Sequence, residues 1–387
     1  MGVRPEARPF VVSGSFVKAI SLLHIADTFP YYLRSDAPTA LFHPGPLIPA
    51  AWERLLPKHP DRLYAYTIVQ IIRNGVRIDY TGPDQLILRP NLPSAKDSIE
   101  TLNKDLQDHH RLMPVATPLP GDRFISSPLG IVPKVSQTDA WRRICHLSFP
   151  PGGSVNDHTP PSWGTLEYAS FDEAVTAVAA AGRGAILIKR DLADAFRHIP
   201  IHRRATGHWA SPGTTNTGQT ASSHSGLRTS PFIFDLFTKG LHFLLEAAPD
   251  IYQNFSVIHY FDDFFAAGIP ALRPQHLSES RFSSICATLG TRIKDSKSIT
   301  GTTADFNGID FDTVVMEVRL PPQKLDKSKD QVTATIRLRS ITLHELQSLT
   351  GYLAFCAKAV PIGRSFLRRL YDAMGGQSWP IPITAKM

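Results

Sequence analysis

Two short segments, Lys189–Phe196 (KRDLADAF) and Tyr260–Asp263 (YFDD), decide the fold of this chain. The apolar run before Asp191 predicts a buried strand, and the apolar residues on either side of Asp262 and Asp263 predict a hairpin with both aspartates at its turn. A carboxylate at the end of a buried strand is costly unless it is paired or binds a metal. Divalent cations relieve the repulsion among three converging carboxylates. The pattern therefore points to a site for a hard cation such as Mg²⁺, and to two-metal phosphoryl transfer.

Length and charge limit the classes of protein to consider. With 387 residues, the chain is long enough for more than one folding unit. Its 32 prolines favour loops and short elements over long helical bundles. The formal net charge of +7 favours a polyanionic partner, although a solvated basic surface would give the same balance.

The three cysteines, Cys145, Cys286 and Cys356, are far apart and form no Cys-x-x-Cys pair. Their spacing argues against a disulfide framework or a zinc site and fits a reducing compartment. No apolar stretch is long enough to span a bilayer, and polar residues interrupt the mildly apolar segment Phe10–Ala26. We therefore expect an intracellular protein, cytoplasmic or nuclear, with no membrane partner.

Hydrophobic patterning divides the chain into four parts. Residues 1–45 show no interpretable pattern and are unassigned, whereas residues 46–110 predict a helical N-terminal extension. Residues 111–322 mix predicted strands and helices, and in the remaining tail, residues 323–387, the segment Leu343–Tyr371 is predicted to be helical. The exception is Arg204–Ser225, which lacks Leu, Ile, Val, Phe and Met and predicts a loop or a disordered segment.

The order of these segments resembles the fingers and palm of reverse transcriptases, most nearly those of DIRS-type (tyrosine-recombinase) retrotransposons. The resemblance covers about residues 46–371, and Ser154–Asp157 (SVND) and Gly226–Pro231 (GLRTSP) recur in the expected order. It implies an α+β fold of the right-hand polymerase type. The fingers and a palm with a small antiparallel sheet would occupy residues 111–322, and a helical thumb residues 323–387.

The resemblance implies a metal site and a nucleotide site. Asp191, Asp262 and Asp263 match the catalytic carboxylates that bind two Mg²⁺ ions, for which Mn²⁺ is a substitute. The Leu192 carbonyl would complete the shell of one ion. Phe196 falls where the family keeps an aromatic ring that excludes a ribose 2′-hydroxyl, although a core phenylalanine is the ordinary alternative.

Further positions match residues that contact the substrates. Lys134 and Arg142 correspond to the cations that clamp the triphosphate, although each alone could equally be an exposed strand residue. Gly226 begins the turn that contacts template and nucleotide. Lys297 matches the lysine proposed to protonate the pyrophosphate, although alone it resembles any surface lysine.

The primer grip and the thumb are also implied by the resemblance. Phe306, Gly308 and Ile309 match the hairpin that grips the primer end, and the arginines of Leu343–Tyr371 would track backbone phosphates. Asn307 stands where the family has leucine. A buried Asn with unmatched hydrogen bonds would cost about 1–3 kcal/mol.

A second departure from the family lies just before Gly226. The family reads Phe-Leu-Pro-Phe-Gly there, whereas this chain has Ala221–Ser225 (ASSHS) before Gly226. One hypothesis is a displaced reading frame between two compensating indels, since gc-ttc-ctc-cca-ttc-ggg encodes both versions in different frames. Intact homologous genomic copies that share this frame would contradict it.

The implied function is an RNA-directed DNA polymerase that adds deoxynucleoside triphosphates to a DNA primer on an RNA template. Protein partners are unknown. A degenerate, inactive retrotransposon remnant and a polymerase-like nucleic-acid-binding scaffold stay open as alternatives. A two-metal nuclease fits the carboxylates but not Phe196, the Gly226 turn or the helical tail. Because the chain ends at Met387, we expect ribonuclease H and recombinase functions in separate proteins or in a longer parent.

Overall fold

The computed structural model describes a large part of the chain. The described residues are 45–83, 86–87, 89–108, 112–114, 124–125, 127–133, 141–159, 166–201, 210–212, 217–220, 226–248, 255–270, 275–375 and 379–383. They belong to two compact units, each assembled from three stretches. Unit 1 comprises Met1–Glu167, Ala193–Leu244 and Ser284–Arg292, and unit 2 comprises Tyr168–Leu192, Leu245–Ser283 and Ile293–Met387. The domain boundaries after residues 45, 110 and 322 stay predictions.

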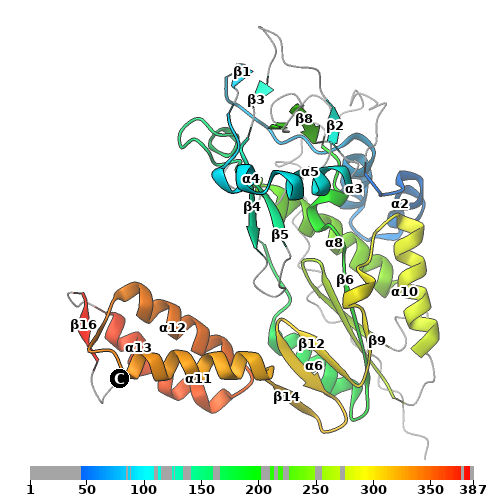
Figure 1. The fold of residues 1–387 in the computed structure, drawn as a ribbon. Helices are drawn as coiled ribbons and strands as arrows, with labels where there is room; N and C mark the ends of the chain where they lie inside the picture. The colour runs from blue at the N-terminus through cyan, green and yellow to red at the C-terminus, as the bar shows by residue number, and fades with distance from the viewer. Residues whose placement is uncertain are drawn as a thin grey trace, which may run out of the picture. The chain divides into compact units, whose positions relative to one another are not determined.

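Unit 2 contains an antiparallel sheet of four strands in the order β11-β6-β10-β9 (Figure 1). The strands are β11 (Ile299–Gly301), β6 (Ile186–Asp191), β10 (Asp263–Gly268) and β9 (Phe255–Tyr260). All six residues of β6 are buried, as expected for a strand covered on both faces. This arrangement confirms the strand predicted before Asp191 and the hairpin predicted around Asp262 and Asp263.

One helix and a second sheet complete the core of unit 2. Helix α6 (Phe171–Ala181) begins at a capping box between Ser170 and Glu173 and packs against β9 and β10. The second sheet has the order β12-β13-β14, with strands at Thr303–Phe306, Ile309–Asp312 and Glu317–Arg319. Rings from both sheets meet in this core, and Phe265 lies 5.1 Å from Phe306 and 5.5 Å from Phe311 between centroids.

The β12–β13 hairpin turns at Asn307 and Gly308, which have φ angles of 49° and 74°. An Asn-Gly pair with positive φ at both positions is the preferred two-residue hairpin loop. Asn307 is half-buried in this turn and is not a core residue. The penalty expected for a buried Asn therefore does not arise.

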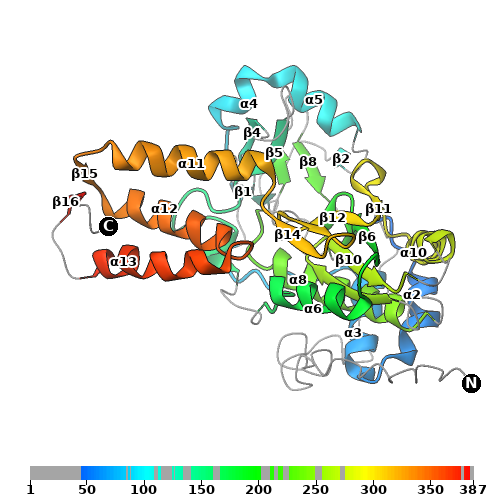
Figure 2. The same ribbon diagram turned by 90° about the horizontal axis from the view of Figure 1, so that it is seen from below.

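Three helices form the C-terminal part of unit 2, as the sequence predicts, and Figure 2 shows them side by side. They are α11 (Pro322–Ile336), α12 (Leu343–Cys356) and α13 (Arg364–Met374), with η6 (Pro361–Gly363) before α13. Helix α12 begins at a capping box between Thr342 and Glu345. Strands β15 (Ser340–Ile341) and β16 (Ile381–Pro382) pair at the far end.

Unit 1 is built mainly from helices. They are α2 (Pro49–Leu55), η2 (Leu56–Lys58), α3 (Arg62–Asn74), α4 (Pro93–Asp97), α5 (Ile99–Asp108), η3 (Asn156–His158), η4 (Ala195–His198) and most of α8 (Ser230–Glu246). Trp52 on α2 is fully buried against Phe237 and donates its indole N–H to the Leu289 carbonyl at 3.0 Å. Leu289 ends α10 (Gln275–Leu289), whose first part belongs to unit 2.

The strands of unit 1 are short. Strands β4 (Leu129–Pro133) and β5 (Trp141–Cys145) form an antiparallel pair. Two further strands, β1 (Leu86–Ile87) and β3 (Phe124–Ile125), pair in parallel.

One prediction is wrong for the described part of Arg204–Ser225. Strands β7 (Ala210–Pro212) and β8 (Thr217–Thr220) pair with each other, and β8 pairs with β2 (Leu112–Pro114). Strand pairing satisfies backbone donors and acceptors, so a short polar segment forms strands without an apolar side chain of its own. The rest of that segment lies outside the described residues.

Candidate catalytic site

Two neighbouring strands of unit 2 bring the three predicted carboxylates to one end of the sheet. Asp191 is the last residue of β6, and Asp263, the first residue of β10, is its direct cross-strand partner. Asp262 lies in the turn between β9 and β10, and its carbonyl accepts a hydrogen bond from the Leu192 amide at 2.9 Å. The hairpin and the end of β6 are thus fixed to each other through the backbone.

The turn that carries Asp262 holds an unusual backbone conformation. Phe261 has a φ of 55°, a region in which a bulky residue is an outlier that costs about 1–3 kcal/mol. Its ring packs against Tyr168, with centroids 4.6 Å apart, and Tyr168 also contacts Tyr260 at 4.8 Å. These ring contacts hold the turn, and with it the backbone direction at Asp262.

Burial and mutual repulsion raise the pKa values of both hairpin carboxyls. Burial is the main cause for Asp262, followed by the negative charge of Asp191. Burial also raises the pKa of Asp263, to about 6, against a lowering effect of Lys189. The Asp263 Oδ1 atom is buried without a hydrogen-bond partner. A nearby cation stabilises the charged form of such partly buried carboxyls.

Two lysines supply positive charge among these carboxylates. Lys297, in η5 (Asp295–Lys297), contacts the Asp191 carboxylate at 2.6 Å, and this hydrogen bond raises the pKa of the lysine. Lys189 is buried, lies 2.7 Å from Asp305 on β12 and is 3.9 Å from the Oδ1 atom of Asp263. Sequence reasoning missed Lys189 and Asp305. The position of Lys189 two residues before Asp191, on the same face of β6, was the available signal.

The donor types at this site suit a hard divalent cation, because carboxylate and carbonyl oxygens are the ligands such ions take. Among the described residues, no group of three or more His, Cys, Asp or Glu side chains is already arranged to hold a metal ion. Asp191 is engaged by Lys297, and Asp263 lies near Lys189. An ion bound at Oδ2 of Asp191 would compete with the Lys297 ammonium for that oxygen, while the orphaned Oδ1 of Asp263 has an acceptor position to offer.

Several other predicted site residues lie in unit 1. Arg142 is exposed on β5, and Phe196 in η4 is half-buried with its ring 5.4 Å from that of Phe234. Gly226 is held by Asn156 of the SVND segment, which donates from Nδ2 to the Gly226 carbonyl at 2.8 Å. The Asn156 Oδ1 atom accepts from the Arg228 amide at 2.9 Å. The two motifs quoted from the sequence therefore meet through one side chain.

The remaining predicted residues have different surroundings. Lys134 lies outside the described residues. Phe306 and Ile309 are fully buried in the core of unit 2. Gly308 is half-buried, and its carbonyl accepts from Lys324 at 2.8 Å. The side chains of Phe306 and Ile309 therefore belong to the core, whereas Gly308 lies at the turn of the hairpin. Leu192 is buried directly after Asp191.

We expect Gly226→Ala to destabilise the protein, because an added Cβ would collide with the backbone oxygen of Cys145. The expected loss of unfolding free energy is about 1–3 kcal/mol, measured by chemical denaturation. Gly351→Ala in α12 is the matched control. A Cβ there meets nothing within 4 Å, so Ala should stabilise the helix by about 0.5–1 kcal/mol. Equal effects of the two changes would contradict the close approach at Gly226.

The raised pKa of Asp263 predicts a pH dependence of stability in the metal-free protein. Between its ordinary value of 3.8 and about 6, the folded chain binds more protons than the unfolded chain at this group. Its contribution to the unfolding free energy therefore falls as pH rises through this window and is constant above it. In EDTA, the stability gained by Asp263→Asn over the wild type should grow across the same window. A difference that is independent of pH would contradict the raised pKa.

Comparison with known proteins gives a fold and no family. No protein-family model and no curated protein matches the chain. The fold is similar to that in solved structures of foamy viral protease-reverse transcriptase, three of which are compared below. The one in complex with double-stranded DNA and described as dRH has a TM-score of 0.60 at 18% identity, over 93% of this chain and 61% of that chain.

The other two structures agree with the first. The complex with RNA/DNA hybrid has a TM-score of 0.54 at 16% identity, over 93% of this chain and 47% of that one. A second double-stranded DNA complex has a TM-score of 0.57 at 18% identity, over 87% and 68%. The chain has a reverse transcriptase-like fold. It spans about half to two thirds of the length of these proteins.

The α+β fold expected from the sequence is thus confirmed at the level of a mixed helix and sheet structure of reverse transcriptase type. Among the described residues, no helix is both long and apolar enough to cross a bilayer.

Proposed function

We propose that this chain is an RNA-directed DNA polymerase, the reverse transcriptase of a DIRS-type retroelement. The observation that carries the proposal is the meeting of Asp191, Asp262 and Asp263 at one end of the β6–β10–β9 sheet, in a chain with a reverse transcriptase-like fold. In this reading, residues 111–322 are fingers and palm and residues 323–387 the thumb. The substrates are deoxynucleoside triphosphates, a DNA primer and an RNA template.

The chain's own residues have defined roles in this reaction. Asp191 and Asp262, with Asp263 beside them, would hold two Mg²⁺ ions, with Mn²⁺ as a substitute. When bound, these ions activate the primer 3′-hydroxyl and neutralise the departing pyrophosphate. Lys297 is half-exposed and hydrogen-bonded to Asp191 in the metal-free chain, and an ion bound at Asp191 would release it. Its ammonium is then available to donate a proton to the leaving group.

Nucleotide selection and triphosphate binding involve unit 1. Phe196 would exclude a ribose 2′-hydroxyl, and the exposed Arg142, with Lys134, would contact the triphosphate. The Gly226 turn, held by Asn156, would contact template and nucleotide through its backbone. The two Asn156 hydrogen bonds would fix the backbone of this turn. We propose an intracellular location, cytoplasmic or nuclear.

The test is primer extension on a poly-riboadenylate template with an oligo-deoxythymidine primer and Mg²⁺. Wild-type protein should extend the primer, and the Asp262→Ala, Asp263→Ala variant should not. Extension by both proteins would refute the assignment of the site. Folded wild-type protein that extends no primer with Mg²⁺ or Mn²⁺ would refute polymerase activity.

The polar composition of Arg204–Ser225 favours a second candidate, an inactive remnant that keeps the fold and binds nucleic acid. Gel-shift measurements with an RNA/DNA hybrid separate the two functions. Salt-sensitive binding without synthesis would support the remnant, because contacts to backbone phosphates do not require the carboxylates.

A further inference from the structure

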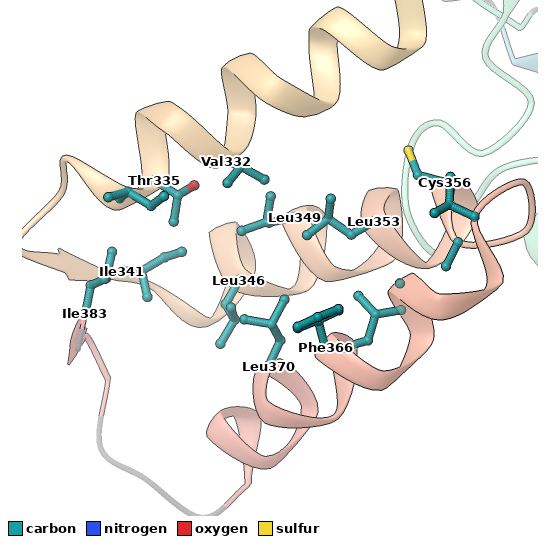
Figure 3. Close-up of a pocket in the computed structure, with 15 residues that line it drawn as sticks. Val332, Thr335, Ile341, Leu346, Leu349, Leu353, Cys356, Phe366, Leu370 and Ile383 are labelled. Carbon is teal, nitrogen blue, oxygen red and sulfur yellow. The ribbon is translucent and has the colours of Figure 1, made fainter. Parts of the chain in front are cut away.

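An apolar groove lies between the three C-terminal helices of unit 2 (Figure 3). Helices α11 and α13 each pack against α12, and the space bounded by the three helices has a volume of about 660 Å³. Apolar side chains from all three helices point into it, and the hydroxyl of Thr335 and the thiol of Cys356 are the polar groups among its lining side chains. The groove is therefore suited to an apolar surface and offers little to a polar ligand.

Residues at the bottom of the groove are buried, whereas large apolar residues on its two sides are exposed. Leu346 and Ala357, on and just after α12, are 1% and 3% exposed. In contrast, Ile336 on α11 is 69% exposed and Phe366 on α13 is 73% exposed. Large apolar side chains that face each other across a groove in water mark a binding surface. Covering them removes apolar area from water at about 25 cal/mol per Å².

The walls have the spacing that receives a helix. Val332 and Ile336 are four residues apart on α11, and Phe366 and Leu370 are four residues apart on α13. Rows of side chains at this spacing form ridges, and the ridges of a further helix pack into the grooves between them. An amphipathic helix that presents an apolar stripe is the ligand for such a surface.

Exposed cations, here called the border charges, are sequence neighbours of residues that line the groove. Arg337, Lys358 and Arg364 are exposed and each directly follows a groove-lining residue in the sequence. None of the three has a side-chain ion pair within the described residues. Positive charge is in excess along residues 322–383, which carry nine Lys and Arg but four Asp and Glu. A ligand with negative charge beside its apolar stripe would complement the border charges.

We propose that the groove binds an amphipathic α-helix of another protein, with Asp and Glu flanking its apolar face. A second copy of this chain would bring the same excess of positive charge. The chain's own residues 1–44 carry four Lys and Arg against three Asp and Glu and so lack the required acidity. A nucleic acid would pair with the cations but leave the side chains of Ile336 and Phe366 in water. The proposal does not depend on polymerase activity.

The probe is a fluorescent peptide of about 14 residues, roughly four helical turns, with Leu along one face and Glu on both flanks. A second peptide has Lys in place of every Glu. Fluorescence anisotropy with the full chain should show that the Glu peptide binds at least about tenfold more tightly, as expected for a preference of about 1.4 kcal/mol. Reversal of the border charges in Arg337→Glu, Lys358→Glu should transfer the preference to the Lys peptide.

Matched substitutions locate the binding site. Phe366→Ser and Ile336→Ser should each weaken binding of the Glu peptide by about tenfold. Ile362→Ser is the control, because Ile362 is 75% exposed but does not line the groove, and it should leave binding unchanged. All three side chains are mostly exposed, so the variants should keep the wild-type midpoint of thermal unfolding.

Five results would overturn the proposal. The first three are a failure of both peptides to bind, binding that Phe366→Ser and Ile336→Ser leave unchanged, and equal affinity for the two peptides. The fourth is a dimer in sedimentation velocity that Phe366→Ser abolishes, because the occupant would then be a second copy. A DNA duplex whose affinity falls as much with Phe366→Ser as that of the peptide would likewise assign the surface to nucleic acid.

Discussion

Asp262→Asn should reduce nucleotide addition by about a thousandfold and at the same time stabilise the metal-free protein. The substitution keeps the size of the side chain and removes its charge. Burial and the neighbouring Asp191 both raise the pKa of Asp262, so at neutral pH its charged form is unfavourable in the folded chain without a cation. A neutral amide removes that repulsion together with the ability to hold a divalent ion.

Two measurements check this expectation independently. Single-nucleotide addition in Mg²⁺ gives the rate, and thermal unfolding in EDTA and in Mg²⁺ gives the stability. Mg²⁺ should raise the unfolding midpoint of the wild type, because it binds the folded state, and should have a smaller effect on Asp262→Asn. Asp312→Asn is the control. Asp312 lies in the same unit, 3.6 Å from Arg319, and its loss of charge should change neither the rate nor the response to Mg²⁺.

Different results would refute different parts of the argument. Wild-type rates in Asp262→Asn would remove Asp262 from the site. A lower unfolding midpoint of Asp262→Asn in EDTA would show that the carboxylates do not repel each other in the folded chain.

Local patterns in the sequence predict much of unit 2 correctly. Short apolar runs in the sequence predict the strands β6, β9 and β10, because a run of this kind is typical of a buried strand. The helix α12 lies in the tail expected to be helical, and the capping boxes at Ser170 and Thr342 explain where α6 and α12 begin. Asp191 ends β6 and Asp263 begins β10, and both strands were predicted from local patterns. The expectation that the carboxylates converge agrees with the pairing of these two residues.

Features that depend on tertiary placement were not predictable. Lys189 and Asp305 are 116 residues apart, and no local pattern connects them. The polar strands β7 and β8 form through backbone pairing, which side-chain hydrophobicity does not report. Phe306 and Ile309 are buried in one core cluster with residues of α6 and β10, so the hairpin proposed as the primer grip is also a core element of this fold.

The buried Lys189 carries the second large prediction. Lys189 is 7% exposed and stands between two carboxylates, Asp305 at 2.7 Å and Asp263 at 3.9 Å. Asp305 belongs to the hairpin proposed as the primer grip, and Asp263 to the proposed metal site. Lys189 therefore connects these two parts of the site through one ammonium group. It also lowers the pKa of Asp263 against the effect of burial.

Lys189→Met should lower the unfolding free energy by about 1–3 kcal/mol at neutral pH, because it removes the charge-assisted hydrogen bond to Asp305 and a cation that stabilises the Asp263 carboxylate. Asp263 would then be protonated more readily and would be a poorer ligand for a divalent ion. Asp305→Asn should cost less, since the Asp305 side chain is 40% exposed and Lys189 keeps Asp263 nearby. Lys329→Met removes an exposed pair and should cost less than about 1 kcal/mol.

A double variant separates the charge effect from a loss of packing. Lys189→Met, Asp263→Asn removes the ammonium together with a carboxylate that it compensates, so it should recover a large part of the stability lost in Lys189→Met. Chemical denaturation of the two single variants and the double variant gives the coupling energy between Lys189 and Asp263. If the effects of the two single variants on the unfolding free energy simply add, Lys189 acts on Asp263 no more than on any distant residue. If Asp263→Asn instead restores more stability in the Lys189→Met background than it gains alone, Lys189 stabilises the charged form of Asp263. The charge balance at this end of the sheet would then govern both the stability of the chain and its affinity for a divalent ion.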